Sequence, residues 1–534
     1  SDPGIEYAVD CLNNLIAQQI SPPTTLLKVM HGQKKTIYQA SKTVKGIDLL
    51  YVLQKRPEFL THLDQNNFSS LVILSLLLYP RDAKPDNFIY KFSKDNTKTT
   101  FIGKIIGIDN DHAFGDGLLR DDNGILTTLR NVLFFLPQMQ DEVAPDFREK
   151  FLKLNPAIIC MQWLKMLHDQ NQRYQRLLDN KIFTEEEFSG SPTNKKQKSL
   201  NLPISLPKGV IERIYHNLSC MQRLLASCPG KVTHQMLFDI IEPSLARLYK
   251  EVAKEQNGQP LKALHKIWEP YFSQEIIDKV LTKEEKLAIP QVNDAETKNK
   301  ISLAQAASDL LMAIDYSDFK ERDIEMIFIH LDKELPFLSE LVIRQCATLT
   351  PKHVLNWLSH LQIDSLVLTG QLDWQAEHII NICQMRPKLR VTLMQESGKI
   401  PLTPTQWAKL MTLNYRINIK IDDELFSLRL LPERLLEIMI EKKIQHEVLF
   451  KFLISQIEHT KLLSLKADLF LKAQRNGCDD FVRFLNQPSN EETSLKQQSS
   501  SNSTWSPGQW RQQPNNTAIL NENDTSDKKS FAKK

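Results

Sequence analysis

The chain reads RDAKPDN at residues 81–87 and IIGIDND at residues 105–111, and these two runs decide the fold. The first run carries an acid, a lysine and an asparagine, which are Asp82, Lys84 and Asn87. The second run is apolar and leads into an acid, Asp109. Phosphoryl transfer requires these parts: an aspartate that orients the attacking hydroxyl, a lysine that offsets phosphate charge, and an asparagine and a second aspartate that hold magnesium.

The residues around these runs predict a helix, a loop and a hairpin, in that order. The apolar run 68–79 predicts a buried helix that ends at Pro80. Strands are expected at 87–93 and 100–109, with a polar hairpin tip at 94–98. The simpler interpretation is a polar loop after a helix, with an ordinary acid at the end of a strand.

The run at 81–87 resembles the catalytic loop of protein kinases, which usually reads His-Arg-Asp-Leu-Lys-Pro-Glu-Asn. On this resemblance Asp82 matches the base, Lys84 the loop lysine and Asn87 the metal-binding asparagine. Pro80 occupies the position of the histidine. The resemblance implies ATP and magnesium as cofactors, and an α+β kinase-like domain with a mostly helical C-lobe.

The run that ends at residue 111 resembles the metal-binding Asp-Phe-Gly segment of the same family, with two departures. Asn110 and Asp111 occupy the phenylalanine and glycine positions. The longer run GIDNDHAF at 107–114 resembles a group of atypical kinase-like proteins, some of which carry leucine-rich repeats. Phosphoinositide-type kinases also lack a strict Phe-Gly pair. The resemblance makes Asp109 the metal ligand and Asp111 a second candidate.

The kinase-like domain is expected over residues 1–290, with an incomplete N-lobe. A kinase also requires a glycine-rich loop and a strand lysine that pairs with a helix glutamate, and the sequence before residue 80 shows neither pattern. Glu6 lies in a predicted helix, and Lys28 follows that helix and is expected to be a surface lysine. The chain is therefore either a fragment whose first strands lie upstream, which the mid-lobe start favours, or a degenerate kinase.

Helical patterns fill most of the remainder of this domain. The apolar spacing over 123–170 predicts helices, as do 210–226 and 232–252. The polar stretch 184–208 breaks the pattern and is interpreted as a flexible insertion. The polar segment around 293–300 marks the expected end of the domain.

The second half repeats a strand pattern every 25 residues. The motif Leu338-x-x-Leu341-x-Ile343 recurs as Ile363-x-x-Leu366-x-Leu368, and its last two positions recur at Val391 and Leu393. A looser copy lies at 417–421, and helices are expected between the copies. Leucine-rich repeats have this period, and their units stack into a curved solenoid. An α/β leucine-rich-repeat solenoid with a helical cap is therefore expected over 300–485, and coincidental spacing in another α/β region is the alternative.

Composition bounds the remaining possibilities. The chain has 534 residues, of which 41% are hydrophobic and 25% charged, and a net charge of +3, so it is globular and nucleic-acid binding is not expected. Seven cysteines without a C-x-x-C pair favour reduced thiols in a cytoplasmic protein. No apolar run is long enough to span a membrane. Residues 486–534 are rich in Ser, Gln, Asn and Lys, and are expected to be disordered.

Two functions are consistent with these patterns. The first is an ATP- and magnesium-dependent phosphotransferase in which Asp82 and Lys84 are catalytic. Asn87 and Asp109 would bind the metal-nucleotide complex, with Asp111 as a further metal ligand. The substrate would be a protein, which the loop spelling favours, or a phosphoinositide lipid, which the divergent metal segment favours.

The second function is an inactive pseudokinase that acts as an interaction scaffold. Under both hypotheses the repeats bind a protein partner. Such repeats resemble the recruitment modules of eukaryotic signalling proteins, and those of effectors that intracellular bacteria inject into the host cytosol.

Overall fold

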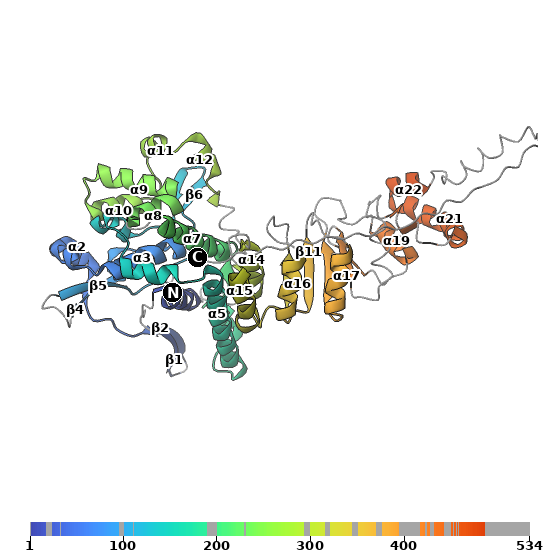
Figure 1. Ribbon diagram of the computed structural model, residues 1–534, viewed down its shortest axis with the longest axis horizontal. Coiled ribbons are helices and arrows are strands. Elements are labelled where there is room, and N and C mark those ends of the chain that lie inside the picture. The colour runs from blue at the N-terminus through green and yellow to red at the C-terminus, as the bar shows by residue number, and fades with distance from the viewer. Residues whose placement is uncertain are drawn as a thin grey trace, which may run out of the picture.

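The computed structural model is an elongated molecule with a mostly helical N-terminal part and a parallel sheet with helices in its second half (Figure 1). The structure describes residues 2–17, 24–32, 34–94, 101–110, 112–189, 200–228, 231–292, 300–315, 321–343, 351–369, 376–394, 417–421, 424–427, 432–442, 450–451, 453–454, 457 and 459–485. Within these ranges, no helix is both long and apolar enough to cross a membrane.

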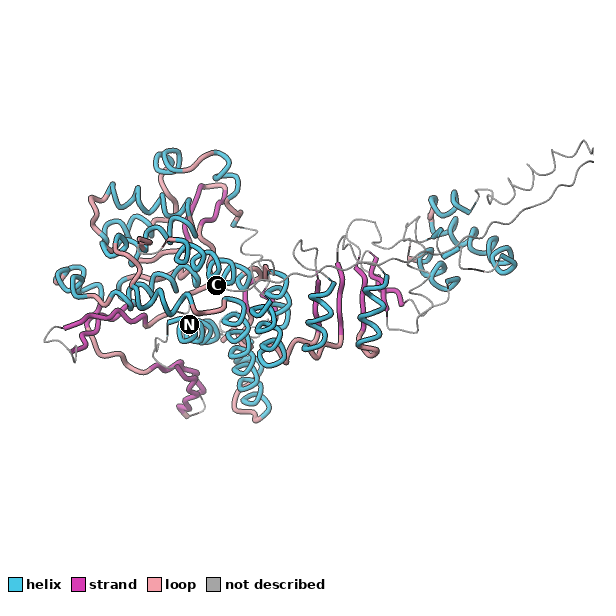
Figure 2. The backbone as a smooth tube through the Cα atoms, viewed as in Figure 1, coloured by secondary structure: helices cyan, strands magenta, loops and turns pink. Residues whose placement is uncertain are grey.

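Helices predominate up to residue 292, and the strands there form short hairpins (Figure 2). The helices are α1 (Pro3–Ala17), α2 (Leu49–Lys55), α3 (Gln65–Leu78), α4 (Pro145–Leu152), α5 (Pro156–Asp179), α6 (Glu185–Ser189), α7 (Val210–Ser227), α8 (His234–Ile241), α9 (Pro243–Glu255), α10 (Pro260–Trp268), α11 (Gln274–Val280) and α12 (Lys283–Ala288). Single 3-10 turns are η1 (Pro57–His62), η2 (Pro85–Asn87), η3 (Val132–Phe135) and η4 (Pro137–Gln140). The strands are β1 (Thr24–His31), β2 (Lys34–Ser41), β3 (Ile47–Asp48), β4 (Phe88–Lys94), β5 (Phe101–Gly107), β6 (Leu118–Asp121), β7 (Gly124–Thr127) and β8 (Leu206–Pro207), the last paired with β9 (Lys300–Ile301).

Helix α3 lies in the middle of this part, and it forms where the apolar run predicts it. The carboxylate of Asp64 caps its first turn by accepting a hydrogen bond from the Asn67 amide at 3.1 Å. Its apolar side chains lie on all sides of the helix, with a few buried Asn and Ser side chains among them, so it is buried among α1, α4, α7 and α8. The helix ends at Tyr79, just before Pro80. The antiparallel hairpin of β4 and β5 follows the loop, so the predicted order of helix, loop and hairpin is confirmed.

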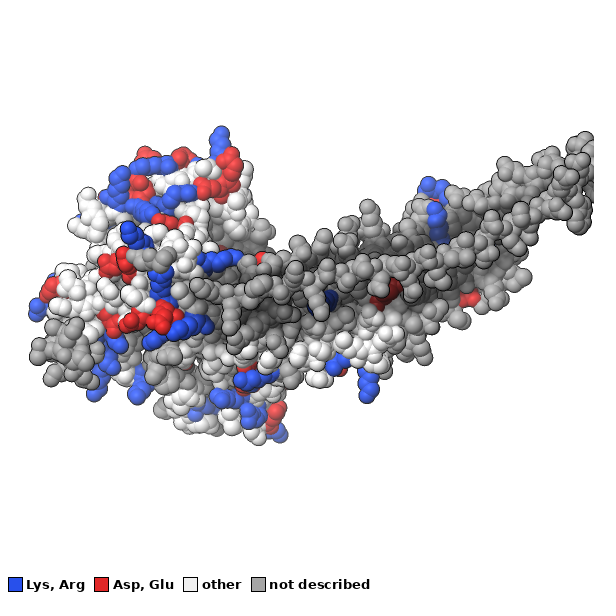
Figure 3. Space-filling view, viewed as in Figure 1, with Lys and Arg blue, Asp and Glu red and all other residues white. Residues whose placement is uncertain are grey.

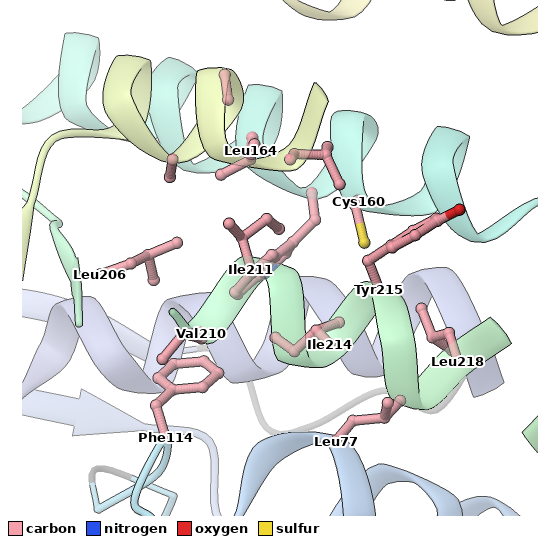
Figure 4. Close-up of a cluster of buried hydrophobic side chains, with 14 of the residues drawn as sticks. Leu77, Phe114, Cys160, Leu164, Leu206, Val210, Ile211, Ile214, Tyr215 and Leu218 are labelled. Atoms are coloured by element: carbon pink, nitrogen blue, oxygen red, sulfur yellow. The ribbon is translucent and has the colours of Figure 1, made fainter. Parts of the chain in front are cut away.

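Helix α7 supplies much of the core beside α3. Its apolar residues recur at helical spacing and are buried against α3, α5 and the segment that follows β5. Figure 4 shows this cluster, in which Val210, Ile211, Ile214, Tyr215 and Leu218 lie among Leu77, Phe114, Cys160, Leu164 and Leu206. The core therefore fixes the loop after β5 as well as the helices.

The prediction of helices over 123–170 is wrong in its first third. Residues 118–127 form the β6–β7 hairpin, and 3-10 turns follow. The Asp121 carboxylate accepts hydrogen bonds from the amides of Asn123 and Gly124, at 2.8 and 3.1 Å, which stabilises a two-residue turn. The turn residues are Asp122 and Asn123, and the run of Asp, Asn and Gly over 121–124 is a turn signal that overrides the apolar spacing.

Both ends of the segment 184–208, expected to be a flexible insertion, are packed. Phe188 in α6 is buried, and so are Leu202, Ile204 and Leu206 before α7. The side chain of Asn171 in α5 pairs with both backbone groups of Ile204, at 2.7 and 2.9 Å. Residues 190–199 lie outside the described ranges.

The second half contains the predicted strand repeat. Its elements are α14 (Leu303–Ala313), α15 (Glu321–Glu334), β10 (Glu340–Ile343), α16 (Pro351–His360), β11 (Ser365–Thr369), α17 (Ala376–Met385), β12 (Arg390–Met394), β13 (Ile417–Ile421), β14 (Glu424–Ser427), α19 (Pro432–Glu441), α21 (His459–Asn476) and α22 (Asp479–Leu485). Strands β10 to β13 pair in parallel, and Leu341, Leu366, Val391 and Ile417 lie in one row. The predicted register with its 25-residue offset is thus confirmed, whereas the identity of a leucine-rich-repeat solenoid stays a prediction.

Two helices join the halves. Helix α14 packs against α5 and α7 and also against β10, and α15 packs against α5 and α16. One connected cluster of buried apolar side chains extends from Ile5 to Phe481. The division of the chain near residues 290–300 stays a prediction, and the expected disordered tail at 486–534 lies outside the described ranges.

Candidate active site

The loop at 78–83 lies between two other backbone segments that fix it on both sides. On one side, residues 112–115 pair with it through hydrogen bonds from Phe114 N to Leu78 O, Gly115 N to Tyr79 O and Arg81 N to His112 O, at 2.5, 3.2 and 2.7 Å. On the other side, residues 130–132 pair with it from Arg130 N to Pro80 O, Ala83 N to Arg130 O and Val132 N to Ala83 O, each at 3.0 Å. The loop backbone is therefore hydrogen-bonded on both sides, like a central strand of a sheet, although its own conformation is irregular.

Asp82, Lys84 and Asn87 lie together on this loop, as their spacing predicts. Nζ of Lys84 lies 3.5 Å from Oδ2 of Asp82 and 3.7 Å from Oδ2 of Asp86. Nδ2 of Asn87 donates to the Asp82 carbonyl at 2.6 Å and lies 3.4 Å from Oδ2 of the same residue. The Asp82 side chain is 31% exposed, so a substrate group has access to it.

The hairpin places Ile108, the residue before Asp109, opposite Asn87. The Ile108 amide donates to the Asn87 carbonyl at 3.0 Å, which continues the pairing of Phe88 with Gly107. Asp109 follows directly and is exposed. Asp111 lies outside the described residues, and the described residues contain no cluster of three His, Cys, Asp or Glu side chains that could hold a metal.

Side chains of opposite charge lie close together at the loop. The carboxylate of Asp82, and then that of Asp86, raises the pKa of Lys84, so its ammonium remains charged at neutral pH. Burial lowers the pKa of the Arg130 guanidinium, and the nearby Tyr249 and Asp82 oppose that shift. The face shown in Figure 3 carries interspersed acidic and basic side chains on the N-terminal part rather than a patch of one sign.

A buried cluster anchors the start of the loop, and sequence reasoning missed it. Tyr79 has a left-handed backbone with φ of 47°, a conformation that is unfavourable for a side chain of this size. Its hydroxyl donates to the carboxylate of Glu242, and the Arg213 guanidinium lies 4.1 Å from its ring centroid. Nη1 of Arg213 also donates to the Gly115 carbonyl at 2.6 Å. These contacts hold Tyr79 in the strained backbone conformation that starts the loop.

Two glycines make room for this cluster. A Cβ atom on Gly115 would lie 2.8 Å from Nε of Arg81, and one on Gly117 would lie 2.8 Å from Oε2 of Glu242. In the sequence, the close packing of this cluster is indicated only by the two glycines of the run 114–117, because residues 79, 213 and 242 are far apart along the chain.

Burial sets the protonation of this cluster. It raises the pKa of Glu242, and the hydrogen bond from Tyr79 and the charge of Arg213 oppose the shift. Burial lowers the pKa of Arg213, and Tyr79, Asp116 and Glu242 oppose it. Nε and Nη2 of Arg213 are buried without a hydrogen-bond partner among the described residues. Tyr79, Asp116 and Glu242, in this order, therefore compensate for the buried guanidinium.

Lys28 and Glu6 do not form the lysine-glutamate pair of a kinase N-lobe. Lys28 is no surface lysine, since its side chain is 16% exposed and its Nζ lies 2.8 Å from Oε2 of Glu187 in α6. Glu6 lies in the first turn of the predicted helix, α1, and accepts a hydrogen bond from Gln39.

Comparison with known proteins adds no identification. No protein-family model matches the chain. No curated protein is significantly similar to it in sequence.

Proposed function

We propose that the chain is an atypical kinase-like phosphotransferase of the cytoplasm that uses ATP and magnesium, with a leucine-rich-repeat-type sheet that binds a protein partner. The observation that carries this proposal is the 3.0 Å hydrogen bond between the Ile108 amide and the Asn87 carbonyl. It joins a loop with a base, a lysine and an asparagine to an acid at the end of the adjoining strand. Phosphoryl transfer needs these groups at one place, because catalysis rests on positioning and charge stabilisation.

The oxygen donors suit magnesium, a hard cation that prefers oxygen ligands. Nδ2 of Asn87 donates to the Asp82 carbonyl, so the amide oxygen points away from that carbonyl. Asn87 and the exposed Asp109 would hold the metal, with Asp111 as a further ligand. When bound, the metal neutralises charge on the phosphate oxygens.

Asp82 and Lys84 would act on the substrate and the transferred group. The partly exposed Asp82 carboxylate would orient the substrate hydroxyl and accept its proton. The Lys84 ammonium, 3.5 Å away, would offset the charge that develops on the phosphoryl oxygens. The substrate would be a protein or a phosphoinositide.

An inactive scaffold is the second candidate, and the N-terminal contacts favour it. Lys28 is paired with Glu187 and Glu6 with Gln39, so these two do not provide the lysine-glutamate pair that positions nucleotide phosphates in kinases. In this case the parallel sheet would supply the function by binding a partner.

The experiment is a calorimetric titration of the full chain with ATP and magnesium, repeated on Asp109→Asn. We expect binding that depends on magnesium and is lost in Asp109→Asn, because the substitution removes an anionic metal ligand. The matched control is Asp86→Asn, which makes the same charge change on the exposed Asp86 of the loop. It should bind about as tightly as the unaltered chain.

A chain that binds no nucleotide, or an Asp109→Asn variant that binds normally, would reject the proposed metal site. The first result would favour the scaffold. The second would assign the nucleotide to other residues, and phosphate transfer from ATP to protein and phosphoinositide substrates would then be measured before any role is given to Asp82.

A further inference from the structure

A cavity lies beside the candidate active site, and none of Asp82, Lys84, Asn87 and Asp109 lines it. It has a volume of about 720 Å³ and is lined by residues of α1, α3, α4 and β5. This volume lies within the range of pockets that bind small organic ligands, roughly 300–1,000 Å³. The cavity is therefore large enough for such a ligand.

One face of α3 forms the long wall of the cavity. The lining residues of α3 recur at helical spacing from Asn67 through Leu71 and Leu74 to Leu78. With a rise of 1.5 Å per residue, this wall is roughly 16 Å long. This wall is therefore long enough to carry an extended chain of carbon atoms.

The polar side chains on this wall are engaged within the protein. Asn67 exchanges two hydrogen bonds with the Ile105 backbone, at 2.7 and 3.0 Å. Ser75 donates to the Leu71 carbonyl at 2.7 Å and accepts from Nδ2 of Asn131 at 2.7 Å. A ligand therefore meets few unused donors or acceptors along the wall, and an apolar body fits it best.

Two of the three departures from the kinase motif lie at the inner end of the cavity. Pro80 and Asn110 both line the cavity, and they occupy the positions of a histidine and a phenylalanine. Asn110 lies beside Gly107, where a Cβ atom would be 3.5 Å from its side-chain oxygen. Smaller side chains at these two positions leave space that larger rings would fill.

The outer rim carries both signs of charge, since Glu149 offsets Lys153. Its lining includes three lysines, Lys104, Lys150 and Lys153, and two aspartates, Asp64 and Asp146. Lys104 lies 3.6 Å from Asp64, and Lys153 lies 2.6 Å from Glu149. Within the described residues, the exposed Lys150 has no such ion pair, so it is available to an anionic group on a ligand.

We propose that this cavity binds a single acyl chain with an acidic head group, the chain along α3 and the head group at Lys150. The proposal is independent of phosphoryl transfer, because none of Asp82, Lys84, Asn87 and Asp109 lines the cavity. The acidic head could belong to a free fatty acid or to a lysophospholipid. Both present the same combination of an apolar chain and an anion.

The test is equilibrium dialysis of the full chain against radiolabelled palmitate. We expect saturable binding of one molecule per chain. Leu74→Trp should weaken it at least about tenfold, because the indole fills the middle of the cavity. Lys150→Ala should weaken it about two- to fivefold, which is the size of an exposed ion pair.

The matched control is Leu287→Trp, which adds the same indole at a side chain that is 70% exposed and away from the cavity. It should leave binding unchanged. Circular dichroism checks that each variant is folded. If Leu74→Trp does not fold, Asn110→Phe provides a second obstruction at the inner end, where the partly exposed Asn110 tolerates a larger side chain.

Absence of saturable binding of both palmitate and lysophosphatidic acid would overturn the proposal. Unchanged binding in a folded cavity-filling variant would also overturn it. Competition by lysophosphatidic acid distinguishes the sources. A lysolipid that binds more tightly than palmitate supports the cavity with a membrane lipid as the source, and the reverse order supports it with a free fatty acid.

Discussion

The loop region at 78–132 and the parallel sheet at 340–421 both consist of short segments, but different contacts hold them. The loop region depends on single contacts between distant residues, such as the bond from Tyr79 to Glu242. The sheet repeats one contact from strand to strand, with Leu341, Leu366 and Val391 in a row. A unique contact has no substitute when it is lost, whereas a repeated contact has neighbours of the same kind.

Removal of the Glu242 carboxylate gives the largest expected effect and tests whether the loop depends on single contacts. Glu242→Ala removes one of the groups that compensate for the buried Arg213 guanidinium and leaves the Tyr79 hydroxyl without its acceptor. We expect a loss of about 3 kcal/mol in the free energy of unfolding, measured by urea denaturation, because both losses fall on buried groups.

The control for this prediction is a glutamate-arginine pair at the surface. Glu285 bonds Arg247, and their side chains are 29% and 44% exposed. Glu285 also accepts a hydrogen bond from the Thr282 amide at the start of α12. Glu285→Ala should cost about 1 kcal/mol, because solvent screens the exposed pair and one helix cap is lost. Equal losses in the free energy of unfolding would show that the buried Glu242 contributes no more stability than the exposed Glu285.

Truncation within the sheet gives the next largest effect. Leu366 is fully buried in β11, and Leu366→Ala should cost about 3 kcal/mol. Since stability in stacked repeats is a sum of neighbour terms, faster hydrogen exchange should stay within residues 340–394. The matched variant is Leu77→Ala in α3, whose side chain is also fully buried. Its effect should appear across the loop region, and exchange that spreads to both halves in either variant would show one cooperative unit.

The repeated region was also the easier one to predict from sequence. A 25-residue offset is visible without any structure, and it fixes both the strands and their register. The candidate site residues at 82, 84 and 87 were equally easy to predict, because they lie within six positions of one another in the sequence. Proximity of Asp109 to them follows from a hairpin, which is a local structure.

Contacts between distant residues could not be predicted in this way. The Tyr79–Arg213–Glu242 cluster depends on how α7 and α9 pack, and no local pattern marks its members. Lys28 was predicted to be a surface lysine. The prediction failed because its partner, Glu187, lies in a later segment of the chain. The hairpin at 118–127 was missed for a different reason: its turn signal was present, but the apolar spacing around it also fits a helix.

A smaller effect is expected at the junction between the halves, where the sheet meets a unique contact. Oγ of Ser308 in α14 accepts from the Val342 amide at 2.9 Å and lies 3.3 Å from the Val342 carbonyl. Ser308→Ala leaves this edge of β10 without its partner and should cost about 1–2 kcal/mol. Hydrogen exchange of the Val342 amide measures it. The control Ser359→Ala, at an exposed serine in α16, should leave that amide unchanged.

The smallest expected effect is a pH dependence from another single contact near the loop. His234 is 1% exposed, with Nε2 at 2.8 Å from Oγ of Ser69 and Nδ1 at 3.0 Å from the Gln138 carbonyl. Burial lowers its pKa, so the unfolded chain takes up the proton first as pH falls below about 6.5. The contribution of His234 to stability should be constant above neutral pH and should fall by at most about 1 kcal/mol between pH 7 and pH 5.5. In His234→Gln the slope of urea denaturation against pH should decrease but not vanish, because burial also lowers the pKa of His168 and His216. An unchanged slope would show that protonation of His234 is not resisted by the fold, and that the contact with Ser69 tolerates a charge.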